Sequence, residues 1–223
     1  MYAQGLATIA ICEAYGLSQD PKLRRPAQLA VDYIVWAQDD NGGGWRYGPK
    51  QAGDTSVVGW QVMALKSAQM AGLNVPEKTM KKAMEYLDNC MADNGGYGYV
   101  GKGASPTMSA VGLLCRQYLQ AWGPKHAMLS KGVANHIIGK NHGVRNMYYT
   151  YYATQVMHHF GGKAWDEWNV KTRDELIATQ NKTNGPDDGS WDPRGGHAHG
   201  RIMMTSLCPV SYTHLTLPTI LRV

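Results

Sequence analysis

A glycine-rich loop recurs along this chain, each time between a charged helical stretch and a nearly uncharged one. Its copies read Gln38-Asp-Asp-Asn-Gly-Gly-Gly-Trp45, then Asn89-Cys-Met-Ala-Asp-Asn-Gly-Gly-Tyr97, then Gln180 through Gly189-Ser190-Trp191. A unit of roughly 50 residues indicates a repeat architecture, because one such supersecondary piece cannot bury its apolar face alone. The loop therefore constrains the shape of the molecule before any residue suggests chemistry.

Hydrophobic periodicity predicts eight helices and the start of a ninth near residue 200. The predicted ranges are 2–17, 24–38, 55–72, 76–91, 107–122, 125–139, 147–160 and 166–180. The stretches 76–91 and 166–180 carry charges on one face and apolar residues on the other, which is typical of helices with one wet side.

The helical stretches that alternate with these amphipathic ones are nearly uncharged. Between them, 2–17, 55–72, 107–122 and 147–160 hold only three full charges, on Glu13, Lys66 and Arg116. A helix that is apolar nearly all round must be buried nearly all round. The chain therefore predicts an all-α fold of about four stacked hairpins, with inner helices covered by an outer layer.

The recurring loops share a glutamine, a spacer and the pattern Gly-x-Trp, with Asn and Tyr replacing Gln and Trp in the middle copy. We expect the glutamine to donate to the free carbonyls at the end of its outer helix and the tryptophan to stack on its amide. The glycines permit the tight return into an inner helix. The residues of this structural motif are Gln38, Gly43, Trp45, Gly96, Tyr97, Gln180, Gly189 and Trp191.

These loops resemble the repeat of the squalene cyclase and protein prenyltransferase superfamily, the squalene-hopene cyclase-like α/α-toroid proteins. The resemblance covers about residues 2–208 and implies an α/α toroid with an inner and an outer ring of helices. Family rings hold more hairpins than the four and a fraction present here. The resemblance therefore implies a partial ring, truncated at both ends.

The final 13 residues, from Ser211 to Val223, break every pattern that precedes them. They resemble the translation of a sequencing adapter joined to a truncated gene, so they are left out of the functional argument. The predicted domains are a toroid over residues 1–208 and a non-native tail over residues 209–223.

Composition weighs against several classes of function. The net charge of +5 is scattered over helices, which fits solvated faces better than a nucleic-acid surface. No apolar run approaches the ~20 residues that a membrane-spanning helix needs. The cysteines show no paired spacing and are expected to be buried free thiols, and no cofactor is expected.

The loops that return to inner helices are expected to gather at one end of the assembly, where several helix N-termini would favour an anion or an electron-rich ligand. The candidate ligand-binding residues at this mouth are Asp54, Thr55, Arg145, Tyr148, Tyr149, His197, His199 and Arg201. Asp54 and Thr55 also fit plain helix capping. Of the four tyrosines within 148–152, two are expected to face the centre and two the core.

The pair His197 and His199 fits three readings: metal ligation, a role on substrate, and loop structure alone. A zinc site needs three or four placed ligands, and no further Cys or His is tied to this pair, so no metal is assigned. His158 and His159, at the end of their helix, read as partners of the helix dipole.

The catalytic motifs of the superfamily are absent from this chain. No Asp-x-Asp-Asp of class II terpene cyclases and no Gly-Cys-Gly-Glu-Gln thioester motif occurs. In Asp54-Thr55-Ser56, a serine stands where the zinc-binding Asp-x-Cys of prenyltransferase β-subunits has its cysteine. We therefore predict a non-catalytic ligand-binding or scaffold toroid, with a lipid-like, peptide or sugar ligand and no nucleic acid.

The alternative is an enzyme on the same fold, either isoprenoid cyclase-like or a polysaccharide lyase. In the lyase, His197 or His199 would be the base, Tyr149 the acid, and Arg145 or Arg201 the carboxylate clamp. A converging His, Tyr and Arg would favour this enzyme, whereas an apolar inner surface would favour a lipid-like ligand. A centre filled by side chains would leave the scaffold.

Overall fold

A computed structural model describes residues 1–140, 144–193 and 200–216 and confirms the predicted all-α class. The helices are α1 (Tyr2–Ser18), α2 (Pro21–Ala37), α3 (Thr55–Met70), α4 (Glu77–Cys90), α5 (Pro106–Gln120), α6 (Ala127–His136), α7 (Met147–Phe160), α8 (Gly162–Thr179) and α9 (Arg201–Thr216), with a 3-10 turn η1 (Val144–Asn146). Two short antiparallel strands, β1 (Tyr97–Gly98) and β2 (Ala104–Ser105), pair within the loop between α4 and α5.

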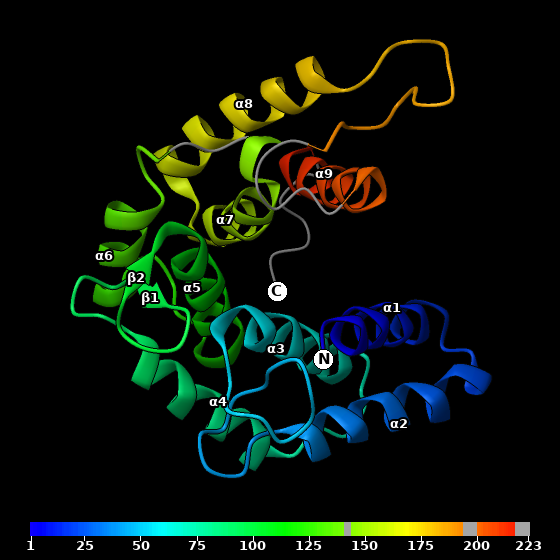
Figure 1. The fold of residues 1–223 in the computed structure, drawn as a ribbon, viewed down its shortest axis with the longest axis vertical. Helices are drawn as coiled ribbons and strands as arrows, with labels where there is room; N and C mark the ends of the chain where they lie inside the picture. The colour runs from blue at the N-terminus through cyan, green and yellow to red at the C-terminus, as the bar shows by residue number, and fades with distance from the viewer. Residues whose placement is uncertain (141–143, 194–199, 217–223) are drawn as a thin grey trace.

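The helices form two layers of an open arc (Figure 1). The odd-numbered helices α1, α3, α5, α7 and α9 lie side by side as the inner layer, and the even-numbered helices lie outside them. The arc is open between α1 and α9. The hairpins thus build a partial α/α toroid, as predicted. Within the described ranges, no helix has both the length and the hydropathy needed to cross a membrane.

The middle of the inner layer is dry, as predicted. In α3 every residue from Thr55 to Leu65 is buried, and in α7 every residue from Tyr149 to Met157 is buried. The outer helix α4 instead buries one stripe that includes Met80 and Leu87.

The first inner helix departs from this prediction. Helix α1 buries only the stripe Gly5, Thr8, Cys12 and Tyr15, and Leu17 is 91% exposed. The expectation that this helix is buried nearly all round is wrong, because α1 lies at the end of the arc and has an inner neighbour on one side only.

The first glycine-rich loop is closed by three buried hydrogen bonds, one from Trp45 and two from Gln38. The indole N–H of Trp45 donates to the carbonyl of Ile34 in the last turn of α2, at 2.8 Å. The Gln38 amide donates to the carbonyls of Gly43 at 2.8 Å and of Thr79 on α4 at 2.9 Å. The predicted role of Gln38 is therefore wrong: the indole satisfies the outer helix, and the amide reaches the next hairpin.

The third copy of the loop repeats this arrangement at the end of α8. The indole N–H of Trp191 donates to the carbonyl of Leu176 at 3.0 Å, and the Gln180 amide donates to the carbonyl of Gly189 at 2.8 Å. In both copies the accepting carbonyl lies one helical turn before the glutamine, so the loops are structural equivalents.

A buried arginine serves the middle copy, which lacks the indole. The Tyr97 hydroxyl accepts from Nε of Arg116 at 3.0 Å and donates to the Met91 sulfur at 3.2 Å. The guanidinium of Arg116 is fully buried, pairs with Asp88 and donates to Gln120 at 2.9 Å. The loop between α4 and α5 is therefore held by a charged network, which also satisfies the buried N–H donors of Arg116.

Two loop glycines allow the loops to touch the next outer helix. Gly43 has a φ of 73°, and a Cβ there would lie 2.3 Å from the Lys82 carbonyl oxygen. Gly95 has a φ of 80°, and a Cβ there would lie 2.6 Å from the backbone nitrogen of Gly132. Any other residue at these positions would be strained and would also clash.

Helix α9 continues through the predicted end of the toroid. Pro209 lies inside the helix, and Ser211 is buried with its hydroxyl donating to the carbonyl of Leu207. The backbone thus shows no break at residues 208–209. The non-native origin of residues 209–223 stays a prediction.

Trp45→Phe keeps an aromatic ring but leaves the buried Ile34 carbonyl without its donor. We expect the free energy of unfolding, measured by urea denaturation, to fall by about 1–3 kcal/mol. The control is Trp36→Phe on α2, where the side chain is 54% exposed and a change within about 0.5 kcal/mol is expected. Equal losses in both variants would contradict the role of the indole N–H.

Burial raises the pKa of the Cys115 and Cys208 thiols to about 12 and that of Cys12 to about 11. The folded state therefore holds the thiol protons more tightly than the unfolded state does. The resulting stabilisation of the folded state is complete below the ordinary thiol pKa and is lost as the pH rises from about 9 towards 12. We expect the free energy of unfolding to fall across this window, and to fall less in Cys115→Ala. Rapid alkylation of all four thiols in the folded protein near pH 8 would contradict this burial.

Candidate functional site

The loops that lead into the inner helices meet at one rim of the arc. The backbone N–H of Thr55 donates to the Tyr99 carbonyl at 2.9 Å, and its hydroxyl donates to the Gly98 carbonyl at 2.7 Å. These bonds dock the α4–α5 loop on the first turn of α3. The Asn146 amide donates to the Thr107 hydroxyl at 3.3 Å, which brings the starts of α7 and α5 together. The ends of the α2–α3, α4–α5 and α6–α7 loops thus lie together at the rim where the sequence predicts a mouth.

Asp54 is a fully buried carboxylate at the N-cap of α3. Its Oδ1 accepts from the Val57 N–H at 2.9 Å and from the Ser56 hydroxyl at 2.6 Å, so the helix N-terminus stabilises the anion. Its Oδ2 is buried without a hydrogen-bond partner, and Nε of Arg46 lies 3.9 Å away. A buried charged oxygen is costly unless a donor meets it, so Oδ2 marks an incomplete site.

Tyrosines surround this carboxylate. The Tyr2 hydroxyl lies 2.6 Å from Oγ of Ser56, and the hydroxyls of Tyr47 and Tyr99 lie 3.0 Å apart. The Arg46 guanidinium lies 6.0 Å from the ring centroid of Tyr47 and 5.9 Å from that of Tyr99. Tyr47 is 60% exposed and Tyr99 37% exposed, so both rings reach solvent.

The carboxylate also affects the hydroxyls around it. Burial raises the pKa of Tyr2, and the charge of Asp54 raises it further. Burial also raises the pKa of Tyr99; the hydrogen bond with Tyr47, the charge of Asp54 and the closeness of the Tyr99 hydroxyl to the Asp54 carboxylate raise it further. Both hydroxyls therefore stay protonated at neutral pH and can donate hydrogen bonds.

An aromatic cluster connects the inner helices α3 and α7 behind this rim. The ring of Trp60 on α3 lies 6.2 Å from Tyr148, 5.5 Å from Tyr151 and 5.5 Å from Tyr152, all on α7. Three of the four tyrosines within 148–152 thus contact Trp60, where two were predicted to face the centre and two the core. The Tyr148 hydroxyl also donates to the Ser56 carbonyl at 3.4 Å.

Two predicted ligand-binding residues have structural roles instead. Tyr149 is 1% exposed and points outward, with its hydroxyl donating to the His136 carbonyl at 3.2 Å. This position does not suit the proposed acid of a lyase. Thr55 is fully buried and docks the α4–α5 loop.

The two predicted arginines have different surroundings. Arg201 pairs with Asp187 at 3.2 Å and Asp192 at 2.6 Å and donates to Ser190 at 2.9 Å, so it anchors the α8–α9 loop. Arg145 is exposed in η1. His197 and His199 lie outside the described residues. Across the part of the chain with described positions, no three His, Cys, Asp or Glu side chains could hold a metal.

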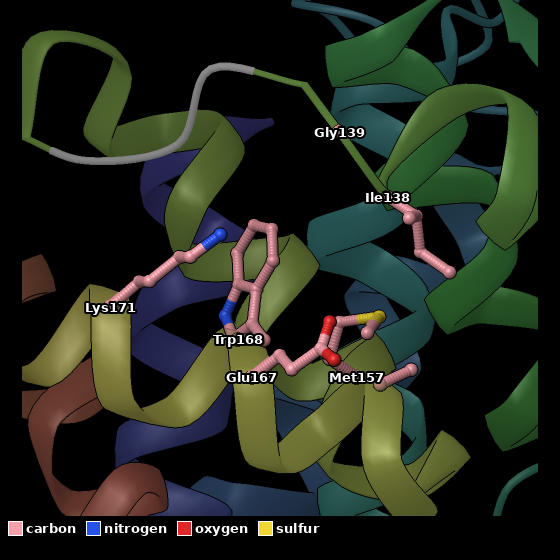
Figure 2. A pocket seen from close by; sticks show the side chains of 7 residues that line it. Ile138, Gly139, Met157, Glu167, Trp168 and Lys171 are labelled. Carbon is pink, nitrogen blue, oxygen red and sulfur yellow. The ribbon is translucent and has the colours of Figure 1, made fainter.

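A shallow groove lies between α8 and the segment after α6 (Figure 2). Trp168 lies across it, flanked by Glu167 and Lys171. The lining residues are Ile138, Gly139, Met157, Ala164, Glu167, Trp168 and Lys171. None of the predicted site residues lines this groove, so the rim around Asp54 is the stronger candidate site.

Sequence reasoning missed Tyr2, Arg46 and Tyr47. Arg46 and Tyr47 directly follow Trp45, so the end of the recurring loop was a signal that could have found them. Tyr2 carried no such signal, because only the packing of α1 beside α3 brings it to Ser56.

No family model matches this sequence, and no curated protein matches it. A solved structure with a similar fold is an inactive variant of the α-1,6-mannanase GH76A of Salegentibacter sp. HEL1_6, with two adjacent aspartates changed to asparagine, in complex with α-1,6-mannotriose. The TM-score is 0.64 at 11% identity, covering 95% of this chain and 74% of that chain. The likeness supports the α/α toroid and does not establish the squalene cyclase assignment within it.

Arg201→Gln should release the α8–α9 loop, because its ion pairs with Asp187 and Asp192 are lost. We expect faster tryptic cleavage at the exposed Lys182, with a loss of at most about 1 kcal/mol in global stability, since the pairs are partly exposed. Arg173→Gln is the matched control, which removes an arginine on α8 whose ion pair is with its neighbour Asp174. Unchanged cleavage in Arg201→Gln would contradict the anchoring role.

Proposed function

We propose that this chain is a non-catalytic α/α-toroid domain that binds an oligosaccharide at the rim around Asp54. The observation that carries the proposal is a buried carboxylate oxygen without a donor, set beside two solvent-reaching tyrosine rings, Tyr47 and Tyr99.

An aromatic rim with polar tips suits a sugar. A pyranose presents a face of C–H groups that packs on an aromatic ring and an edge of hydroxyls that needs hydrogen-bond partners. Tyr47 and Tyr99 offer both ring faces and hydroxyls, and Tyr2 adds a further hydroxyl nearby. The mannanase of similar fold holds α-1,6-mannotriose, which supports a sugar as the ligand class.

Hydrolysis of a glycosidic bond needs a second carboxylate near the first, and the described residues place no second one in the tyrosine cluster around Asp54. Glycosidases place two carboxyl groups about 5–9 Å apart around the scissile bond. The Asp39 oxygens accept from the backbone N–H of Asn41 at 3.2 Å and of Gly42 at 2.8 Å, and Asp40 pairs with Lys50 at 2.8 Å. Among the residues with described positions, Asp54 is the carboxylate of the tyrosine cluster, and it stands alone there.

The second pair of adjacent aspartates is also engaged in its own loop. Asp187 pairs with Arg201 at 3.2 Å, and Asp188 accepts from the Thr183 N–H at 3.1 Å. These carboxylates hold the α8–α9 loop, which favours binding without hydrolysis.

A lipid-like ligand is a weaker candidate than a sugar. Trp60, Tyr151 and Tyr152 pack against one another, with Trp60 only 4% exposed. An isoprenoid would need an empty apolar space, and this aromatic packing offers none between the three rings. We therefore place the ligand at the rim and not in the middle of the arc.

Calorimetric titration with α-1,6-mannotriose and other neutral trisaccharides tests this proposal. We expect wild-type binding and about five- to tenfold weaker binding by Tyr47→Ala, because a central aromatic contact is removed. Tyr33→Ala, an exposed tyrosine on the outer helix α2, is the control and should bind as wild type does. Absence of binding to every sugar would contradict the ligand class, and release of reducing ends would contradict the non-catalytic assignment.

A further inference from the structure

We infer that Oδ2 of Asp54 is the acceptor for a sugar hydroxyl and that Arg46 covers it, so that the site takes neutral oligosaccharides and rejects charged ones. This inference rests on the proposed function and names the ligand chemistry of the same site.

The unmet atom defines what the ligand must bring. Oδ1 of Asp54 is already satisfied by the Val57 N–H and the Ser56 hydroxyl, whereas Oδ2 has no partner although it is buried. An ionised carboxylate oxygen only accepts hydrogen bonds. The complementary ligand group is therefore an O–H or N–H donor.

The charges around Oδ2 distinguish a neutral hydroxyl donor from a charged ammonium donor. Nε of Arg46 lies 3.9 Å from Oδ2, and the guanidinium also lies over the rings of Tyr47 and Tyr99. A ligand ammonium would meet this positive charge at short range, so a cationic ligand is disfavoured.

An anionic ligand is disfavoured by the carboxylate itself. Asp54 is fully buried, and bringing a second negative charge to it would add repulsion where water cannot screen it. A neutral hydroxyl avoids both penalties and still forms a charge-assisted hydrogen bond with Oδ2. The neighbouring tyrosine rings then pack on the C–H face of the same sugar.

Arg46 is suited to move aside for such a ligand. Its side chain is 38% exposed. Its guanidinium makes the 3.9 Å ion pair with Asp54 and contacts the rings of Tyr47 and Tyr99. It donates no hydrogen bond to any residue that the structure describes. A partly exposed ion pair of this length is weak. A sugar hydroxyl can therefore replace the guanidinium beside Oδ2 while Arg46 stays near the tyrosine rings.

Asp54→Asn tests the acceptor. Asparagine is as good an N-cap as aspartate, so the bonds to Val57 and Ser56 can be kept and the fold retained, as circular dichroism would check. We expect affinity for α-1,6-mannotriose to fall about tenfold or more, because the charged acceptor is lost. Asp40→Asn, on the same loop but with an exposed carboxylate, should bind as wild type does.

Arg46→Gln tests the selectivity. Wild type is expected to bind α-1,6-mannotriose and to reject both a glucosamine trimer and a galacturonate trimer. With the guanidinium removed, the variant should gain measurable binding of the glucosamine trimer, because a ligand ammonium can then meet Asp54. A merely structural role for Arg46 would weaken all ligands and create no new specificity.

The outcomes separate the inference from the proposed function. If wild type binds no neutral trisaccharide, both fail. If wild type binds α-1,6-mannotriose and Asp54→Asn binds it equally well, the sugar-binding function stands and the role of Oδ2 is wrong. If Arg46→Gln still rejects the glucosamine trimer, the covering role of Arg46 is wrong.

Discussion

The hydrogen bond from the Trp45 indole to the Ile34 carbonyl is the constraint on which the rim depends. It fixes the end of the loop against α2, and the Trp45 carbonyl in turn accepts from the Asp54 N–H at 3.0 Å. Gln38 carries the same loop to Thr79 on α4. One buried indole thus positions the cap of an inner helix, and with it the carboxylate of the candidate site. Because unmet buried carbonyls are costly, this corner has little freedom to adopt another arrangement.

The three described copies of the loop solve the same problem with different chemistry. Trp191 repeats the indole bond to its own outer helix, while the middle copy uses the Arg116 guanidinium with Tyr97 and Asp88. Each of these loops needs one buried hydrogen-bond donor that holds it in place beside the outer helix. Each corner therefore keeps a buried side-chain donor, although the donor and its acceptor both change in the middle copy, which explains why the sequence pattern is incomplete.

The fold describes the scaffold of this chain, and the side chains of the rim indicate the chemistry of its ligand. The toroid shared with a mannanase at 11% identity describes the scaffold alone, because one fold hosts many functions. The ligand chemistry is argued from the side chains: an unmet carboxylate oxygen, the Arg46 guanidinium near it and tyrosine hydroxyls that stay protonated. Behind this rim, Trp60 and Tyr152 are buried with their ring centroids 5.5 Å apart.

The sequence by itself determined the helices, their alternation between dry and wet, and the corners between them. Those features depend on periodicity and on glycine, which act over a few neighbouring residues. Only the tertiary structure decided that α1 is half exposed, that Tyr149 points outward, and that Tyr2 and Tyr47 join Asp54. Such meetings depend on how whole helices pack, since the direction of a side chain across the arc is set by neighbours distant in the chain. The buried Oδ2 without a donor belongs to this second kind, because a helix cap is visible in the sequence but its unmet oxygen is not.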